Sequence, residues 1–210
     1  MSSRRFNTHS LAMKCSSPSA ERNKSVIGGV FEKHMNCKKV FEVASGSGQH
    51  VSYLAARFPD TYFQPSEVEV ESFDSINEWA YGLANVGKPL LVDTTQIEDP
   101  FPLQGFDGLM CINMIHISPY ESCEGLAKLA EEILVSEGKI LLYGPYIREG
   151  VNTSNSNLEF DKWLKAKDSR FGIRRLDRVS GTFETHGFSL DKVIEMPANN
   201  CVVIFKRKAR

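Results

Sequence analysis

Residues 40–50 constrain the fold of this chain more than any other segment. Their sequence is VFEVASGSGQH. Residues 40–43 predict a short buried strand, residues 44–48 a tight turn, and Gln49 the start of a helix. Gly46 and Gly48 let the backbone come close to a ligand where a side chain would collide with it. The segment therefore predicts a strand–turn–helix unit with a ligand site at the turn.

The negative charge of Glu42 limits which ligands can bind at the turn. A turn that holds a pyrophosphate uses a helix N-terminus and has no fixed negative charge beside it. Glu42 stands two residues before Ala44, the first residue of the turn, where its carboxylate would repel phosphates and attract cations. A nucleoside that carries a sulfonium and an ammonium fits this charge, and we expect S-adenosylmethionine, with S-adenosylhomocysteine as its product. A nicotinamide-dependent oxidoreductase is the alternative that the charge disfavours.

Composition limits the remaining classes of function. The chain has 210 residues and a formal net charge of −1, so one domain is expected and there is no electrostatic case for nucleic acid or an anionic membrane. The five cysteines are scattered without a CxxC pair, so we expect neither a disulfide framework nor a zinc site. A reducing compartment follows, and we expect the cytoplasm, with entry into the nucleus left open. No apolar run reaches the length of a membrane span.

The order of the expected elements predicts an α/β fold. We expect a flexible tail over residues 1–18 and a single domain over residues 19–210. Ser17 and Pro18 are typical of a helix start. Strands are expected at residues 40–43, 61–64, 90–92, 108–113, 139–143, 188–196 and 201–206, and further helices at 49–58, 72–84, 121–135, 158–166 and 173–186. Alternation of strands and helices predicts a mostly parallel sheet, and the hairpin at 188–206 adds an antiparallel last strand.

Polar residues at the ends of four expected strands form the candidate site. Glu42, Asp93 and Asn113 end strands, and Glu67 follows one about twenty residues after the glycine turn, the offset of a carboxylate that holds a ribose. Arg22 is a candidate partner of the cofactor's carboxylate. The other expected cofactor contacts are Asn23, Ala44, Ser45, Gly46, Gly48, His50, Thr94 and Met114.

Several of these residues also have a purely structural interpretation. Glu67 is followed by further acids and could belong to a solvated helix start. Asp93 could cap a turn with Thr94 and Thr95. His50 could be a partly exposed helix residue, and Arg22 could form a surface ion pair with Glu21 or another acid.

Longer motifs resemble a known family. Residues 42–48 resemble the acidic-x-Gly-x-Gly-x-Gly turn of class I methyltransferases, with Ala44 in place of the first glycine. The strings AERNK (20–24), ASGSGQH (44–50), QPS (64–66), CINMIHI (111–117), YGPY (143–146) and EMPANN (195–200) are similar to the methyltransferase-like protein 26 family. The resemblance implies a Rossmann-like class I methyltransferase sandwich with a seven-stranded sheet that binds S-adenosylmethionine. It does not imply an acceptor.

The acceptor side is less constrained. If the acceptor must lose a proton, His116 is the candidate base, although a lone histidine after an apolar strand is more often structural. Residues 144–167 interrupt the path from a strand to the next helix and are expected to form a substrate lid. Tyr143, Tyr146, Ser156 and Asn157 are the candidate substrate contacts, and the two tyrosines could equally be core aromatics. The unidentified acceptor is a small molecule or a protein, and a catalytically silent scaffold that keeps the cofactor fold is the alternative.

Overall fold

The computed structural model describes residues 14–97 and 99–208. Most of the expected tail, residues 1–13, lies outside the described residues. Cys15, near the end of the expected tail, contacts the domain through α3 (Phe73–Trp79). The backbone N–H of Cys15 donates to the Ser75 hydroxyl at 2.9 Å, and the Trp79 indole donates to the Cys15 carbonyl at 2.7 Å. The described chain therefore contacts the domain before α1 (Pro18–His34) begins.

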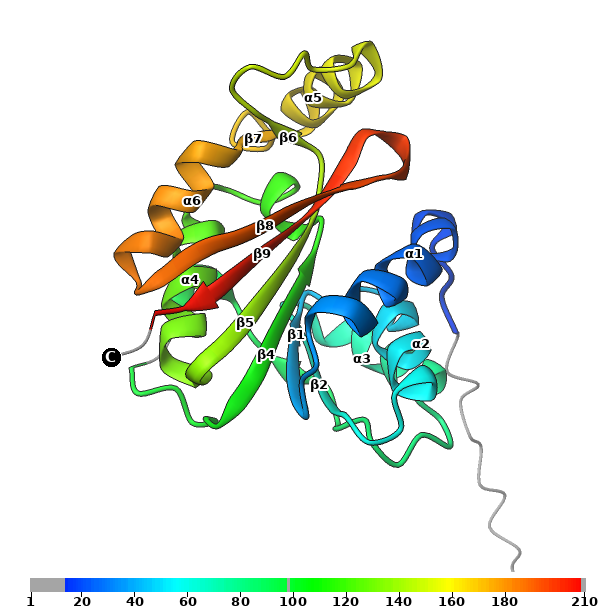
Figure 1. The fold of residues 1–210 in the computed structure, drawn as a ribbon. Coiled ribbons are helices and arrows are strands. Elements are labelled where there is room, and N and C mark those ends of the chain that lie inside the picture. The colour runs from blue at the N-terminus through cyan, green and yellow to red at the C-terminus, as the bar shows by residue number, and fades with distance from the viewer. Residues whose placement is uncertain (1–13, 98, 209–210) are drawn as a thin grey trace, which may run out of the picture.

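A seven-stranded sheet forms the centre of the molecule (Figure 1). Its strand order is β3-β2-β1-β4-β5-β9-β8. The strands are β1 (Lys39–Val43), β2 (Tyr62–Glu67), β3 (Leu90–Leu91), β4 (Phe106–Ile112), β5 (Leu134–Gly144), β8 (Phe188–Met196) and β9 (Asn200–Arg207). Strands β1 to β5 pair in parallel, and β9 runs antiparallel to both β5 and β8. The predicted mostly parallel sheet with an antiparallel last strand is confirmed.

Helices cover both faces of the sheet. α1, α2 (Gln49–Arg57) and α3 lie on one face, and α4 (Glu121–Ile133) and α6 (Leu176–Thr185) lie on the other (Figure 1). Ile27 and Phe31 of α1 pack with Leu54 of α2 in one buried cluster, while Leu126 of α4 packs with Phe183 of α6 in the second. None of the helices in the described ranges is long and apolar enough to cross a bilayer.

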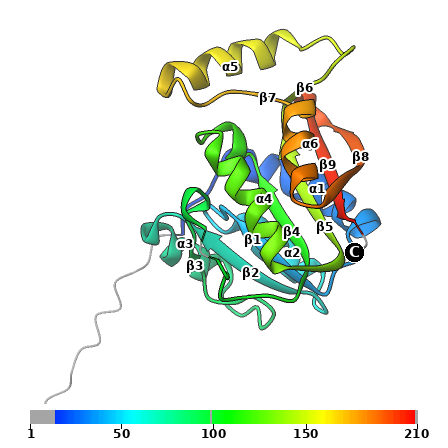
Figure 2. The same ribbon diagram turned by 90° about the vertical axis from the view of Figure 1, so that its left-hand side faces the viewer.

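The segment between β5 and α6 leaves this sandwich. After β5 the chain forms β6 (Tyr146–Ile147), α5 (Asn155–Lys167) and β7 (Arg174–Arg175), and β6 pairs with β7 in a separate two-stranded sheet. Figure 2 shows α5 outside the two helical layers, beyond the end at which β5 leaves the sheet. The α5 helix begins at Asn155, where the side chain of Ser154 caps it by accepting from the Asn157 N–H.

Some predicted boundaries were wrong. The helix expected to reach residue 84 ends at Trp79, and the helix expected from residue 173 begins at Leu176, because Arg174 and Arg175 pair with β6. The strand expected at 61–64 extends to Glu67, which makes Glu67 the last residue of β2 and not a residue beyond it.

Candidate functional site

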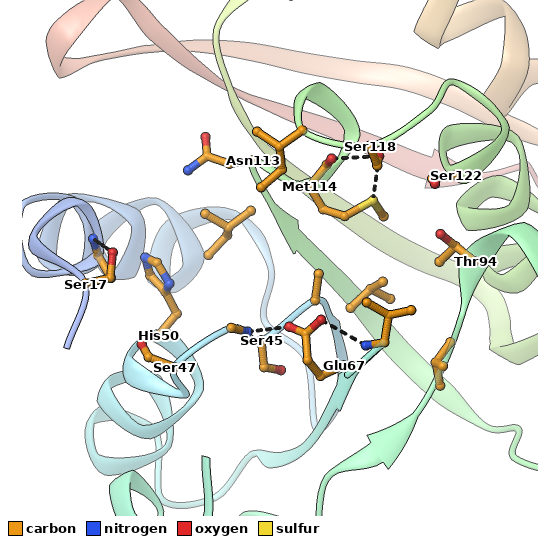
Figure 3. A pocket seen from close by; sticks show the side chains of 18 of the residues that line it. Ser17, Ser45, Ser47, His50, Glu67, Thr94, Asn113, Met114, Ser118 and Ser122 are labelled. Carbon is orange, nitrogen blue, oxygen red and sulfur yellow. Dashed lines mark hydrogen bonds between the residues drawn. The ribbon is translucent and has the colours of Figure 1, made fainter. Parts of the chain in front are cut away.

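A cavity of about 370 Å³ lies at the carboxyl ends of the parallel strands (Figure 3). This volume is within the range of small-molecule sites, roughly 300–1,000 Å³. The cavity is at the point where the strand order reverses between β1 and β4, which is the usual ligand position in such sheets. The lining residues are Ser17, Ser19, Ala20, Val43, Ala44, Ser45, Gly46, Ser47, His50, Glu67, Val68, Val92, Asp93, Thr94, Ile112, Asn113, Met114, Ile117, Ser118 and Ser122.

The glycine-rich turn forms the floor of the cavity. Ala44, Gly46 and Gly48 have φ angles of 57°, 56° and 90°, so the turn needs left-handed backbone at three positions. Ala44 adopts this conformation in spite of its Cβ, which costs on the order of 1 kcal/mol. The N–H of Ser45 donates to the Ser66 carbonyl at 2.9 Å. The turn is thereby fixed to the end of β2.

Glu67 joins the turn to the cavity. One carboxylate oxygen accepts from the Gly46 N–H at 2.7 Å, and the other accepts from the Val68 N–H at 2.9 Å (Figure 3). Each oxygen of a carboxylate can accept a second hydrogen bond. Glu67 is therefore held in place and still has acceptor capacity toward a ligand, as the predicted ribose contact requires.

Asp93 has the turn-capping interaction that the sequence left open. Its carboxylate accepts from the Thr95 N–H at 2.8 Å and from the Thr95 hydroxyl at 2.7 Å. The hydrogen bond from the Thr95 side chain lowers the pKa of Asp93, so the carboxylate is ionised at neutral pH. Asp93 and the buried Thr94 also line the cavity, so the cap holds both at the wall.

Glu42 lies beneath the turn and does not line the cavity. Its side chain is 2% exposed, and one carboxylate oxygen has no hydrogen-bond partner among the described residues. Burial raises the pKa of the Glu42 carboxyl to about 7, a hydrogen bond with Ser45 opposes this shift, and the charge of Glu67 adds to it. The raised pKa brings the ionisation of Glu42 close to neutral pH.

We expect Glu42→Gln to change how stability depends on pH. An unfolded glutamate ionises near pH 4.5, whereas the folded protein keeps the proton until about pH 7. The contribution of this group to stability is therefore full below pH 4.5 and is lost as the pH rises to 7. The Glu42→Gln variant has no such loss. The unfolding free energy of the variant, taken relative to that of the parent, should therefore rise by about 2–3 kcal/mol between pH 4.5 and pH 8.

Urea unfolding of both proteins at the two pH values measures this difference. The other titrating groups are common to both proteins and cancel in the comparison. An advantage of the same size at both pH values would show that Glu42 ionises normally in the folded state.

Asn113 and Met114 form the wall that follows β4. Asn113 has a φ of 64°, and its N–H donates to the Tyr143 carbonyl at 2.8 Å. Its carboxamide has no hydrogen-bond partner in the described part of the chain and lines the cavity. A strained backbone beside a ligand site is typical of functional positions. The carboxamide is available to either the cofactor or an acceptor.

Four expected cofactor residues do not line the cavity. Besides Glu42, these are Arg22, Asn23 and Gly48. Arg22 is exposed, and the alternative ion pair with Glu21 is not formed, because Glu21 pairs with Lys24 at 2.7 Å. Gly48 is the N-cap residue of α2, and a Cβ there would lie 2.7 Å from the Cα of Ile76. Gly48 is thus required for the packing of α2 against α3.

The structure does not place His116 where the predicted base would act. His116 is fully buried, and its Nε2 has no partner among the described residues. Its ring contacts Tyr146 edge-on at 5.0 Å between centroids. Burial, with a smaller contribution from Arg174, lowers the pKa of His116 to about 3. A base must reach the proton that it accepts, so we correct this interpretation and assign His116 to packing.

The expected substrate contacts also lie outside the cavity. Tyr143 and Tyr146 are buried in the two core clusters, as the alternative interpretation held. Asn157 donates to the Asn199 carbonyl at 3.0 Å, and the Ser156 hydroxyl accepts from the Asn199 carboxamide at 3.2 Å. These bonds attach α5 to the turn between β8 and β9. No described residue of 144–167 lines the cavity, so the lid stays a prediction.

The sequence missed the contribution of the N-terminus of α1. Ser17, Ser19 and Ala20 line the cavity, and Ser17 also caps α1 by accepting from the Ala20 N–H at 3.4 Å. The capping signal was recognised, but nothing local indicates where the helix end points. Ile117, Ser118 and Ser122 were missed as well, although they closely follow Asn113 in the chain.

A family assignment follows from the whole sequence. Residues 14–207 match the family described as "Protein of unknown function (DUF938)". The chain belongs to the DUF938 family. The match extends from the segment that contacts α3 to the end of β9. In this member of the DUF938 family it therefore includes all seven strands of the central sheet.

Solved structures share the fold of this DUF938 protein at low identity. An O-methyltransferase family protein from Burkholderia thailandensis matches with a TM-score of 0.77 and 13% identity over 91% of this chain and 57% of that one. Human N-acetylserotonin methyltransferase, solved with S-adenosylmethionine, matches with a TM-score of 0.74 and 12% identity over 91% and 53%. The chain spans little more than half the length of these proteins. The likeness shows the class I methyltransferase fold.

Proposed function

We propose that this protein is an S-adenosylmethionine-dependent methyltransferase. The observation that carries the proposal is the charge of the cavity. Glu67 and Asp93 line it, and no lysine or arginine is among the described residues that line it. Carboxylates attract a sulfonium and an ammonium and repel a pyrophosphate. The charge therefore favours this cofactor over a dinucleotide.

The arrangement of the lining residues suggests how the cofactor binds. We assign the ribose to Glu67, whose acceptor capacity matches two hydroxyl donors, and the adenine to the wall of Asp93 and Thr94. The amino-acid end then extends toward Ser17 and His50. Figure 3 shows these two residues on the side of the cavity opposite Thr94.

Two likenesses support the proposal. The motifs of the sequence resemble the methyltransferase-like protein 26 family over nearly the whole chain, and we propose membership of that family as the finer assignment. Two of the similar solved structures are described with the cofactor or its product: the human enzyme with S-adenosylmethionine, and the methyltransferase CalO1 of calicheamicin biosynthesis with S-adenosylhomocysteine. CalO1 is 13% identical with a TM-score of 0.73.

The chemistry needs little from the protein beyond placement. S-adenosylmethionine supplies an electrophilic methyl group that a nucleophile attacks in line with the methyl–sulfur bond. The chain must bind and orient the reactants and keep water out. Ile117, which is 49% exposed and lines the cavity, offers an apolar surface at its rim. We propose that the acceptor, a small molecule or a protein side chain, enters there.

Calorimetric titration tests the proposal. We expect S-adenosylmethionine and S-adenosylhomocysteine to bind in the micromolar range, about −8 kcal/mol, and NAD to produce no heat of binding. Saturable binding of NAD without a response to either sulfur nucleoside would refute the proposal. Binding of both sulfur nucleosides without methyl transfer to any acceptor pool would instead favour the scaffold.

A further inference from the structure

His50 belongs to a polar network that starts in the cavity and ends in the core. The ring nitrogen Nε2 of His50 lies 2.7 Å from Oδ1 of Asn23, and the polar side chain of Asn23 also interacts with the phenol of Tyr143, where it opposes the rise in pKa that burial causes. The three residues come from α2, α1 and β5. Asn23 and Tyr143 are buried, whereas His50 lines the cavity. The imidazole of His50 is thus the member of the network that a ligand in the cavity can reach.

The network fixes the tautomer of that imidazole. An amide oxygen only accepts hydrogen bonds, so Nε2 of His50 must carry the hydrogen that it donates to Asn23. In the neutral ring the hydrogen on Nε2 leaves Nδ1 with a lone pair. Nδ1 has no partner among the described residues and is not one of their fully buried unpartnered atoms. It is therefore an acceptor that is open to a ligand.

The ring also stays neutral. Burial, and to a smaller extent the charge of Lys24, lower the pKa of His50 to about 4. Lys24 in turn pairs with Glu21, whose carboxylate also accepts from the Gln49 side chain at 3.3 Å. These are the charged groups that face His50 from α1. A neutral ring matters here because an imidazolium would repel a cationic ligand.

His50 lies at the end of the cavity that is far from the proposed adenine wall. Figure 3 shows His50, Ser17 and Asn113 on one side and Thr94 and Ser122 on the other. Glu67 lies between the two sides in the same view. A nucleoside with its ribose on Glu67 would therefore direct its 5′ substituent toward His50.

We propose that Nδ1 of His50 accepts a hydrogen bond from the α-ammonium of the ligand's amino-acid end, with Asn23 as the positioning residue that sets the tautomer. The inference rests on the proposed function. It assigns recognition of the amino-acid part to a neutral side chain and leaves the ribose to Glu67. Arg22, exposed and away from the cavity, has no role in it.

Two ligands separate this contact from the rest of the site. S-adenosylhomocysteine has the amino-acid end, and 5′-deoxy-5′-methylthioadenosine lacks it but keeps the nucleoside and the thioether. We expect a variant that loses the contact to bind S-adenosylhomocysteine about tenfold more weakly. Its affinity for methylthioadenosine should stay within about twofold of the parent, since that ligand does not reach Nδ1.

A matched pair of variants identifies the atom. The amide of His50→Asn places an oxygen near the position of Nδ1, whereas the longer His50→Gln reaches the position of Nε2 and leaves Nδ1 without a replacement. His50→Gln should therefore bind S-adenosylhomocysteine about tenfold more weakly than the parent does, and His50→Asn should keep most of the affinity of the parent. Glu67→Ala is the control, because loss of the ribose contact should weaken both ligands together.

Nitrogen NMR of the ¹⁵N-labelled protein tests the positioning role without any ligand. The parent should show His50 almost entirely as the Nε2–H tautomer, and Asn23→Leu should lower this population to that of a free histidine side chain and weaken only the binding of S-adenosylhomocysteine. An Nδ1–H tautomer in the parent would overturn the inference. So would equal losses of both ligands in His50→Gln, or no loss at all. If the parent binds neither ligand, the proposed function itself is wrong.

Discussion

Gly125→Ala should destabilise the protein more than a glycine-to-alanine substitution at any other glycine of the described helices. Gly125 lies in α4 against the turn that carries Asp93 and Thr94. A Cβ at this position would lie 1.5 Å from the Thr94 carbonyl oxygen, so the helix and the turn must separate. We expect a loss of about 3 kcal/mol in unfolding free energy. Because Thr94 and Ser122 both line the cavity, ligand affinity should fall as well.

Gly181→Ala is the matched control for that experiment. Gly181 lies in α6, and a Cβ there would have no atom within 4 Å. Alanine has the higher helix propensity, so this variant should be more stable than the parent by about 0.5–1 kcal/mol. Urea unfolding of the two variants and the parent gives the comparison. If Gly125→Ala unfolds at the urea concentration of the parent, α4 does not approach the turn this closely in solution.

The central strands could be predicted because they are buried on both faces, and such strands have nearly continuous apolar sequences. The expected strand at residues 188–196 also has the bounds of β8, although β8 is an edge strand in which only Phe188 and Met196 are buried. The expected strand at 40–43 differs from β1 by one residue. The parallel arrangement of the central strands followed from general rules on βαβ connections.

Elements that depend on distant partners could not be predicted. β6 and β7 have two residues each and exist because Tyr146 pairs with Arg174 and Ile147 with Arg175. Neither segment has a periodic pattern that distinguishes it from a loop. The start of β5 was missed for a related reason: Leu134 follows α4 without a break and pairs with Phe106 across a register shift.

The candidate site could be predicted where it depends on strand ends and not where it depends on packing. Glu67, Asp93 and Asn113 meet because parallel strands end at one edge of the sheet. The burial of His116 depends on Gly144, whose Cβ position lies beside the imidazole, and on the ring of Tyr146. These contacts involve residues about thirty positions away in the sequence. The residues next to His116 therefore do not indicate whether its side chain lies in the core or in the cavity.

The glycine turn offers the sharpest separation of binding from folding. A Cβ at Gly46 would have no atom within 4 Å, and Gly46 lines the cavity. The Cβ of Gly46→Val would therefore meet no protein atom, and we expect its branched side chain to occupy space that the ligand needs. We expect the variant to fold, with a loss of about 1–3 kcal/mol from left-handed backbone, and to bind S-adenosylhomocysteine at least about a hundredfold more weakly, since a ligand cannot share the volume of a side chain.

Gly82→Val is the control for the backbone strain alone. Gly82 has a φ of 81°, against 56° for Gly46, and a Cβ there would also have no atom within 4 Å. Because Gly82 lies outside the cavity, its variant should lose a similar amount of stability and keep the affinity of the parent. Thermal unfolding and calorimetric titration of both variants give the two quantities. A folded Gly46→Val protein that binds S-adenosylhomocysteine within threefold of the parent would mean that the ligand does not pass over the turn, and the site would have to be sought away from the carboxyl end of β1.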